Sequence, residues 1–273
     1  MIAKGSLQLK YDYRGESMKL LLKRFVKKAL AGFVSVLSKT KAGRFIQSEI
    51  VRQTMRMTKK VKHNDCDLTF TIPNTLSYFR AESFSQKEPE TLDWIDSIPE
   101  GSTVWDIGAN VGLYSVYAAK YRSCNVYAFE PSVFNLELLA RNIFINEMVG
   151  SITIVPLPLT ETLKRSSLNM TSTDLGGALS TFGETYGYDG ETLEKVFEFS
   201  TIGLSMVDAV QLLKIPVPDY IKLDVDGIEQ LVLKGGEGIL SVIKGLLIEV
   251  DDDFDEQRTM VHQYLSDAGL TLK

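Results

Sequence analysis

Apolar residues recur at helical spacing in the first part of the chain, within residues 17–38. The positions that share one helical face are Leu22, Phe25, Val26, Ala29, Leu30, Phe33 and Leu37. Lysines and one arginine crowd the first half of this stretch, and residues 44–60 have a similar basic character. The pattern predicts two basic helices before the main body of the protein.

The pattern changes after residue 67. Residues 68–80 predict a short pair of strands, with Pro73-Asn74 as the turn between them. Residues 88–97 predict a helix, because Pro89 would lie in its first turn and acidic residues lie at its N-terminus.

From residue 102, apolar β-rich runs alternate with helical segments. The predicted strands are residues 103–107, 125–129, 152–159, 219–225 and 245–250, and the predicted helices are residues 113–120, 133–146, 205–214, 228–233 and 255–268. This alternation predicts an α/β fold with a doubly wound, mostly parallel, Rossmann-like sheet covered by helices on both faces. Residues 160–204 form a long insertion rich in Gly, Ser and Thr, which we expect near the carboxyl ends of the strands.

Composition and charge refine this outline. The 273 residues are 44% hydrophobic and 24% charged, as in a soluble globular protein. Residues 1–62 contain 16 Lys and Arg but 3 Asp and Glu, whereas residues 63–273 contain 14 and 32. We therefore expect a basic helical extension over residues 1–62 and an acidic main domain over residues 63–273, with its ligand-binding half at about residues 100–160. The acidic body argues against nucleic acid as a partner.

Two interpretations of the basic extension are open. Residues 17–60 could form a peripheral membrane anchor, with apolar side chains in the interface and lysines against anionic lipid. They could instead form a helical cap or a dimer arm. Cys66 and Cys124 cannot build a disulfide framework, and no apolar run is long enough to span a bilayer. We expect a cytoplasmic protein, at most peripheral at the inner membrane face.

The run Val104–Gly112 (VWDIGANVG) combines features of a ligand-binding turn. A strand that ends in Asp106 leads through Gly108, Asn110 and Gly112 into a helix, whose first N–H groups are unpaired. The GxxxG spacing differs from the dinucleotide fingerprint GxGxxG, which disfavours a nicotinamide oxidoreductase. Glu130, followed by Pro131, lies at the end of the second strand. A carboxylate at this position can accept hydrogen bonds from two ribose hydroxyls. Together these residues predict an adenosine-plus-amino-acid ligand such as S-adenosylmethionine; the alternative is an ordinary strand-to-helix turn with capping acids.

Acidic residues also follow the fourth predicted strand. Asp224 and Asp226 end this strand, Glu229 opens the next helix and Lys222 lies within the strand. Crowded carboxylates raise each other's pKa, so one could act as a general base, or they could help to hold a divalent cation. The alternative is helix capping combined with a Lys222 ion pair. Asp251, Asp252 and Asp253 predict a solvated acidic rim beyond Glu249. With His63 and His262 as the only histidines, we expect no metal site such as zinc.

These motifs resemble those of the FkbM family of S-adenosylmethionine-dependent methyltransferases. The resemblance rests on VWDIGANVGLYS (104–115), VYAFEPSVFNLELLARNI (126–143), YIKLDVDGIEQLVLKGG (220–236) and LLIEV (246–250). It implies a class I methyltransferase fold and O-methylation, often of sugar hydroxyls in natural products or bacterial surface polysaccharides. It also implies cofactor contacts for Asp106, Gly108, Asn110, Gly112 and Glu130, and matches Glu88-Pro89-Glu90, Ser205 and Asp208 to further polar positions of the family.

From the resemblance we expect a small-molecule or glycan acceptor, with Asp224 or Asp226 as the base and Glu229 and Lys222 in support. Asn169, Ser180 and Tyr186 of the insertion would line the acceptor pocket. The alternatives are an N-methyltransferase, which Asp224-Val225-Asp226-Gly227 disfavours, and a non-catalytic cofactor-binding scaffold.

The class I sheet normally ends in a hairpin of two strands after the last helix. Here residues 269–273 could begin at most one strand, so we expect the hairpin to be incomplete. Either the chain is truncated or the N-terminal segment covers the open edge.

Overall fold

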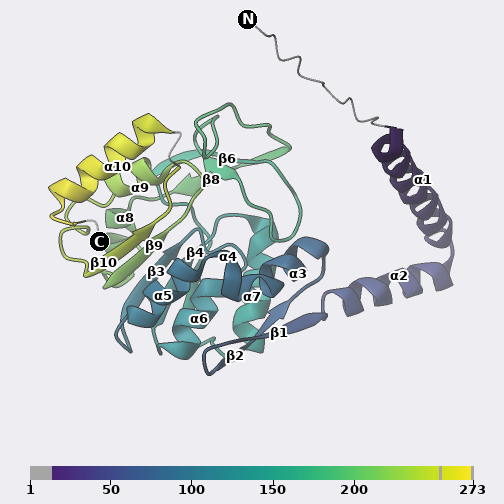
Figure 1. The fold of residues 1–273 in the computed structure, drawn as a ribbon, viewed down its shortest axis with the longest axis horizontal. Coiled ribbons are helices and arrows are strands. Elements are labelled where there is room, and N and C mark those ends of the chain that lie inside the picture. Colours follow the sequence, from purple (N-terminus) through teal and green to yellow (C-terminus); the bar gives the residue numbers. More distant parts are fainter. Residues whose placement is uncertain (1–13, 252–253, 272–273) are drawn as a thin grey trace, which may run out of the picture. The chain divides into compact units, whose positions relative to one another are not determined.

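The computed structural model describes residues 14–251 and 254–271 and divides the chain into two units, Met1–Thr54 and Met55–Lys273 (Figure 1). The first unit contains α1 (Arg14–Leu37) and α2 (Lys41–Thr54), which confirms a pair of basic helices. Gly43 packs against the backbone carbonyl of Leu37 at the turn between them, where a larger side chain has no room. The division falls earlier than the expected boundary at residue 62.

The second unit opens with an antiparallel hairpin of β1 (Thr58–His63) and β2 (Cys66–Thr71). Two predictions are therefore wrong: the second basic helix does not reach residue 60, and the strand pair precedes residues 72–80. Exposed and half-buried positions alternate along β1, as in a strand with one solvated face. Because the strand is rich in lysine, its sequence resembles that of a basic helix. Asn64 takes a left-handed backbone conformation with φ 50° in the turn, whereas Asn74 caps a helix, because its side chain accepts a hydrogen bond from the Ser77 N–H.

Three short helices follow: α3 (Thr75–Glu82), α4 (Phe84–Lys87) and α5 (Pro89–Ser97), the last of which confirms the predicted helix with Pro89 in its first turn. The remaining elements build the α/β body. They are β3 (Thr103–Ile107), α6 (Leu113–Tyr121), β4 (Asn125–Phe129), α7 (Val133–Ile145), β5 (Ile152–Val155), β6 (Lys164–Met170), β7 (Ser180–Phe182), β8 (Phe197–Gly203), α8 (Met206–Gln211), β9 (Tyr220–Leu223), α9 (Glu229–Lys234), β10 (Gly245–Ile248) and α10 (Asp255–Asp267).

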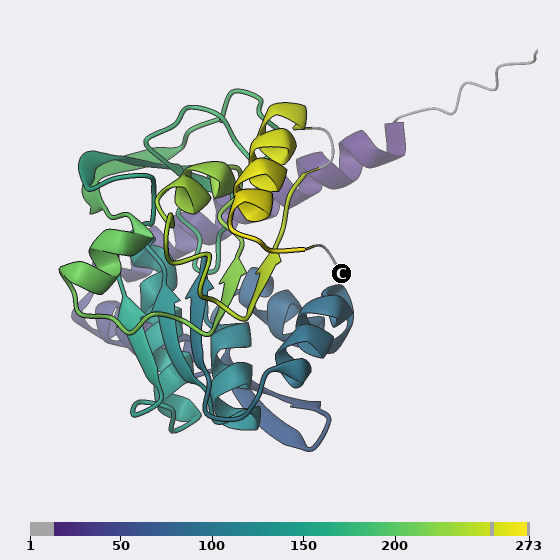
Figure 2. The same ribbon diagram turned by 90° about the vertical axis from the view of Figure 1, so that its left-hand side faces the viewer.

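Five parallel strands form the central sheet, which confirms the predicted parallel sheet, and their order is β10-β9-β3-β4-β5 (Figure 2). The order reverses between β3 and β9, and ligands bind at the carboxyl ends of strands beside such a switch point. In the register, Asp106 of β3 lies directly beside Lys222 of β9. Because neighbouring parallel strands share their pleat, these two side chains point to the same face of the sheet.

The two faces of the sheet bury separate cores. Val104, Val126 and Ala128 pack with α6, α7 and β2 on one face. Trp105 and Ile107, which alternate with them along β3, pack with α8, α9 and α10 on the other. The sheet is thus covered by helices on both faces, and its strands are apolar on both sides because both sides are buried.

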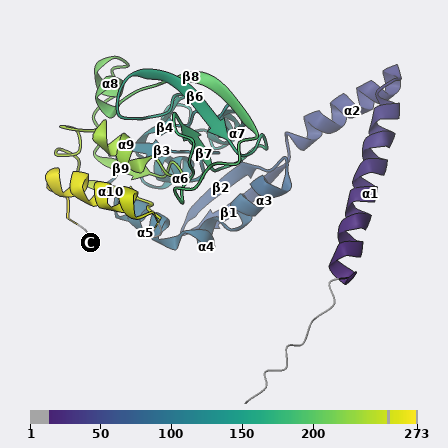
Figure 3. The same cartoon turned by 90° about the horizontal axis from the view of Figure 1, so that it is seen from above.

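The long insertion folds into a second, antiparallel sheet of order β7-β6-β8 (Figure 3). Phe182 of β7 and Leu168 of β6 pack in a small core with Ile228, which precedes α9. This core fixes the insertion to the body of the domain beside the end of β9.

The chain after α10 has no strand among its described residues, Ala268–Thr271, so β10 has one strand neighbour, β9, in the described structure. Asp252, Asp253 and residues 272–273, on which part of the predicted acidic rim and the last predicted strand fall, lie outside the described residues, as do residues 1–13. No helix among the described residues combines the length and the hydrophobicity that crossing a bilayer requires.

Candidate active site

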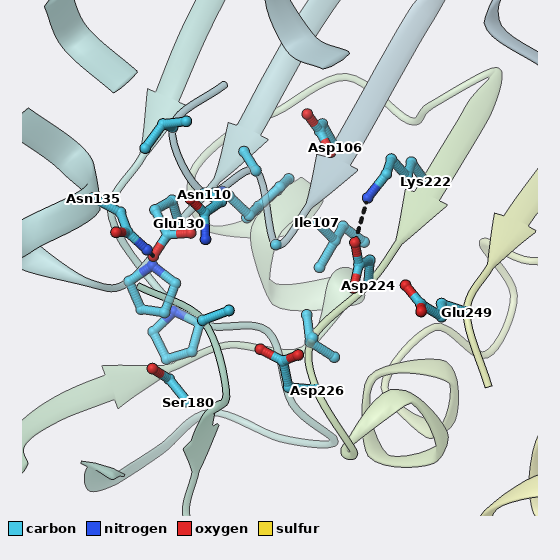
Figure 4. A pocket seen from close by; sticks show the side chains of 18 of the residues that line it. Asp106, Ile107, Asn110, Glu130, Asn135, Ser180, Lys222, Asp224, Asp226 and Glu249 are labelled. Carbon is cyan, nitrogen blue, oxygen red and sulfur yellow. Dashed lines mark hydrogen bonds and ion pairs between the residues drawn. The ribbon is translucent and has the colours of Figure 1, made fainter. Parts of the chain in front are cut away.

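A cavity of about 290 Å³ lies at the carboxyl ends of β3, β4 and β9 (Figure 4). Its wall combines carboxylates of the central sheet with residues 177–180 and 182 of the insertion. The predicted residues that it brings together are Lys222, Asp224, Asp226, Asp106, Gly108, Asn110, Glu130, Pro131 and Glu88. Gly112 and Glu229 lie outside this lining.

Asp106 is buried at the end of β3, where its Oδ2 accepts a hydrogen bond of 2.5 Å from Ser115 Oγ of α6. Burial raises the pKa of this carboxyl, while the nearby Lys222 ammonium and the Ser115 hydroxyl oppose the increase. The Asp106 carboxyl thus borders the cavity, and one cation and one hydroxyl favour its charged form against the effect of burial.

The turn after Asp106 carries three residues with left-handed backbones, Gly108 with φ 87°, Asn110 with φ 50° and Gly112 with φ 79°. A side chain at Gly108 would collide with the backbone carbonyl of Asp224, so glycine allows the turn to pass against the end of β9. Asn142 of α7 stabilises the turn, because its Nδ2 donates a 2.8 Å hydrogen bond to Val111 O. Gly112 serves as the N-cap residue of α6.

Glu130 follows β4 and is buried, with an exposed fraction of 5%. Its two carboxylate oxygens accept hydrogen bonds from the backbone N–H groups of Asn110 at 2.8 Å and Ser132 at 2.7 Å. Burial raises the pKa of Glu130 to about 7, although these hydrogen bonds and one from Asn135 oppose the increase. The carboxylate thereby joins the glycine-rich turn to the start of α7 and presents acceptor atoms to the cavity.

Lys222 is a buried lysine on the site face of β9. Its Nζ forms an ion pair of 2.8 Å with Asp224 Oδ2 and lies 5.4 Å from the centre of the Tyr114 ring. Burial works against the charged ammonium, but the carboxylates of Asp224 and Asp106 outweigh it and raise the pKa of Lys222. Burial also opposes ionisation of Asp224, yet Lys222 lowers the pKa of this carboxyl. Asp224 is therefore held deprotonated by a fixed counter-charge.

Asp226 has a different environment. Its backbone is left-handed, with φ 57°, a conformation that costs energy for any residue with a side chain. The strained turn directs its carboxylate into the cavity, where Oδ2 accepts a 2.7 Å hydrogen bond from the Leu179 N–H (Figure 4). Burial and the charge of Asp224 raise the pKa of Asp226 to about 6.

Glu229 lies behind this turn. Its carboxylate accepts hydrogen bonds from the N–H groups of Val225 at 3.0 Å and Gly227 at 3.1 Å, and from Gln257 Nε2 of α10. Burial raises the pKa of Glu229 to about 7. These contacts stabilise the turn that carries Asp226 and connect it to α10.

The insertion is fastened to both halves of the cavity. Gly177 O accepts hydrogen bonds from Asn110 Nδ2 at 2.8 Å and Asn135 Nδ2 at 3.0 Å, and Gly176 N–H donates to Asn135 Oδ1. Asn135 was not predicted from the sequence. The feature of the sequence that could have identified it is a polar residue in the first turn of the largely apolar helix α7, which follows Glu130. Tyr114, Arg80 and Lys87 were likewise missed as lining residues.

The three predicted acceptor-pocket residues have different positions. Ser180 lines the cavity. Asn169 is buried and donates a 2.7 Å hydrogen bond to Glu184 O, and the Tyr186 hydroxyl accepts one from Gln230 Nε2. The hydroxyl of Tyr186 and the amide nitrogen of Asn169 thus form hydrogen bonds within the protein, and neither residue lines the cavity.

The cavity fits S-adenosylmethionine. Within the described residues, two buried acceptors of its lining, Asp106 Oδ1 and Asn110 Oδ1, have no hydrogen-bond partner. Buried acceptors of this kind require donors, and an ammonium group and ribose hydroxyls would supply them. Asp106 and Asn110 would therefore hold the cofactor together with Glu130. No group of three or more His, Cys, Asp or Glu among residues 14–251 and 254–271 is arranged to hold a metal ion.

Comparison with known proteins identifies the family of the chain. The family model of the methyltransferase FkbM domain matches residues 106–270, more than half of the chain. A hexuronic acid methyltransferase, AglP of Haloferax volcanii, is 25% identical over 202 residues, which are 74% of this chain and 77% of that protein. The methyltransferase sdnD of Sordaria araneosa is 34% identical over 59 residues, 21% of this chain and 23% of that protein.

Among solved structures, the methyltransferase FkbM of Methylobacillus flagellatus KT is similar with a TM-score of 0.44 and 18% identity. That match covers 63% of this chain and spans 38% of the other. The family match begins at Asp106 and runs through Glu130 and Asp226 to the end of α10, so it contains nearly every acidic side chain of the cavity. The chain therefore belongs to the FkbM family of S-adenosylmethionine-dependent methyltransferases.

Proposed function

We propose that this methyltransferase transfers a methyl group to a hydroxyl oxygen of a sugar, with Asp226 as the general base. The observation that carries the proposal is the position of Asp226: its carboxylate shares one cavity with Asp106 and Glu130, and its pKa is raised to about 6. A base whose pKa lies near the working pH is the most effective, because it is mostly deprotonated and still accepts a proton.

The bound cofactor supplies an electrophilic methyl group on a positively charged sulfur. Asp226 accepts the proton of the sugar hydroxyl as the new oxygen–carbon bond forms and the carbon–sulfur bond breaks. Lys222 and Asp224 form a fixed ion pair beside it, and Glu229 holds the turn that aims Asp226. Leu179 and Ser180 of the insertion line the cavity, so a bound acceptor would lie between the insertion and the end of the sheet, where its access to bulk water is reduced.

An acidic sugar is the acceptor class that the site supports best. AglP, which is 25% identical, is named as a hexuronic acid methyltransferase. Arg80 and Lys87 add cations to the lining of this otherwise acidic cavity. Arg80 is anchored by a 2.9 Å hydrogen bond from its Nε to Gly176 O, and its charge acts on Asp226. The Arg80 guanidinium, which lies near the proposed base, could form an ion pair with the carboxylate of a sugar acid.

The test uses S-adenosylmethionine labelled in its methyl group and three acceptors: a hexuronic acid glycoside, the matching neutral hexose glycoside and a nucleoside. We expect label on the hexuronic acid in a form that survives dilute alkali, because a methyl ether resists hydrolysis. Label that alkali removes would be a methyl ester, and the hydroxyl assignment would be wrong. Label confined to the nucleoside would overturn the choice of a sugar.

The cofactor site makes a separate prediction. Replacing Glu130 by alanine should weaken S-adenosylmethionine binding by about ten- to hundredfold, because hydrogen bonds to a charged acceptor contribute about 1.5–3 kcal/mol. Isothermal titration calorimetry measures this loss. Glu137→Ala is the matched control, since Glu137 is exposed on α7 and pairs with Arg141. Equal affinities in the two variants would contradict the assignment of Glu130.

A further inference from the structure

Residues 20–54, the part of the N-terminal unit whose side chains the structure describes, form no apolar core. Among residues 20–54 only Gly43 is buried, and none of the three core clusters contains a residue from this range. Large apolar side chains of α1 are exposed instead, among them Leu22 at 62%, Phe25 at 70% and Phe33 at 63%. An exposed apolar surface of this extent indicates a site that binds a membrane or another protein.

The apolar and basic side chains of α1 lie on opposite faces. At 3.6 residues per turn, one half of the helix circumference, roughly, carries apolar residues and the other half carries the cations. The apolar half contains Leu21, Leu22, Phe25, Val26, Ala29, Leu30, Phe33 and Val36, and the basic half contains Lys23, Arg24, Lys27 and Lys28. Such an apolar half is wider than the narrow seam that pairs two helices in a coiled coil.

We propose that α1 lies on an anionic membrane surface, with its apolar half in the boundary between headgroups and acyl chains. Charge favours this partner, because residues 20–54 contain eight Lys and Arg and one acidic residue, Glu49. A lipid interface offers favourable contacts to both halves of the helix: the phenylalanines are buried among the acyl chains, while the lysines extend to the lipid phosphates. A second copy of the chain would cover the apolar half but would bring like charges close together.

The decisive measurement is sedimentation of the full chain with vesicles. One set contains equal parts of phosphatidylglycerol and phosphatidylcholine, and the other contains phosphatidylcholine alone. We expect binding to the anionic vesicles that weakens as salt is added, because the attraction to anionic lipid is screened. Absence of the chain from the anionic vesicle pellet would overturn the proposal.

Two pairs of substitutions on α1 separate the apolar half from the basic half. Phe25→Gln with Phe33→Gln removes two apolar anchors and should lower partitioning onto anionic vesicles by at least about tenfold. Leu20→Gln with Val34→Gln is the matched control, since both side chains are exposed, at 54% and 49%, but belong to the basic half. Replacing Lys23, Arg24, Lys27 and Lys28 by glutamine should lower partitioning by about fivefold for each charge.

Two further readouts make each outcome decisive. Unchanged titration of S-adenosylmethionine shows that the catalytic unit of every variant is folded. Light scattering without vesicles gives the molecular mass. A wild-type dimer that Phe25→Gln with Phe33→Gln converts to monomer would assign the apolar half to a second copy and overturn the membrane proposal. Equal vesicle binding by the two pairs of substitutions would overturn it as well.

Discussion

Asp226→Asn should lower kcat by about 10²–10⁴-fold, because general base catalysis contributes that much to a reaction whose nucleophile must lose a proton. Asparagine keeps the size of the side chain and can still accept the hydrogen bond from the Leu179 N–H. The loss should therefore appear in kcat, with S-adenosylmethionine binding nearly unchanged. Initial rates at saturating cofactor and acceptor, together with calorimetry, measure the two effects.

Asp174→Asn is the control for this experiment, since Asp174 is an exposed aspartate on the same insertion. A comparison with Asp224→Asn tests the other carboxylate at the end of β9. Because Lys222 lowers the pKa of Asp224, this residue is the weaker base of the two. If Asp224→Asn abolished turnover while Asp226→Asn kept it, the roles would be exchanged. Near-normal turnover in both variants would refute the base assignment.

The pH dependence of kcat follows from the raised pKa of Asp226. The carboxylate accepts a proton when it is deprotonated, so the rate should rise with pH and level off above about 6, the pKa of this group. Below that pH the rate should fall tenfold per unit, because the deprotonated fraction falls tenfold per unit. Asp226→Asn should remove this limb from the profile. A wild-type profile without a limb near pH 6 would contradict the assignment.

Lys222→Met should destabilise the protein by about 3–5 kcal/mol, because it leaves buried carboxylates without their counter-charge. Asp106 lies beside Lys222 in the sheet, and Asp224 pairs with its ammonium at 2.8 Å. Methionine fills a similar volume, so the loss reports charge rather than a cavity. Urea unfolding measures it. Lys234→Met is the matched control, because Lys234 is 56% exposed and pairs with Glu161 at 3.8 Å, a surface pair that contributes about 0–1 kcal/mol.

This destabilisation should itself depend on pH. In the wild type, the lowered pKa of Asp224 stabilises the fold above the pKa of the unfolded carboxyl. Without Lys222, burial would raise the pKa of Asp224 in the folded state and would raise that of Asp106 further. The folded variant would then lose stability as pH rises above the pKa of the unfolded carboxyls. The difference in unfolding free energy between wild type and Lys222→Met should therefore be larger at pH 8 than at pH 5. A small, pH-independent difference equal to that of Lys234→Met would show that the ion pair carries little stability.

The main sheet was predictable because its signals are local. Parallel strands that are buried on both faces form short apolar runs, and each run here is bounded by a glycine, proline or acidic residue. The hairpin of β1 and β2 was misplaced for a related reason. The lysines of β1 lie at its exposed and half-buried positions, so a strand with one solvated face resembled a basic helix. A pairing with β2, rather than the composition of β1, determines its conformation.

The site was predicted in part. Each strand-end acid could be recognised from its position, because the carboxyl ends of parallel strands meet at one edge of the sheet. The relation of the insertion to these acids could not be recognised in the same way. Asn135 contacts Gly176 and Gly177, and Asp226 contacts Leu179, across more than 40 positions of sequence in each case. No local pattern encodes contacts of that separation.

The sequence by itself determined the alternation of strands and helices in the central sheet, the family, and the residue types at the carboxyl end of each of its strands. These properties are set by short-range periodicity and by motifs of a few residues. Only the tertiary structure decided the environment of each acid. It placed Glu229 behind the turn, paired Asp224 with Lys222 and directed Asp226 into the cavity. The reason is physical: burial and the neighbouring charges set the pKa and the exposure of a carboxyl, and both depend on residues that are distant along the chain.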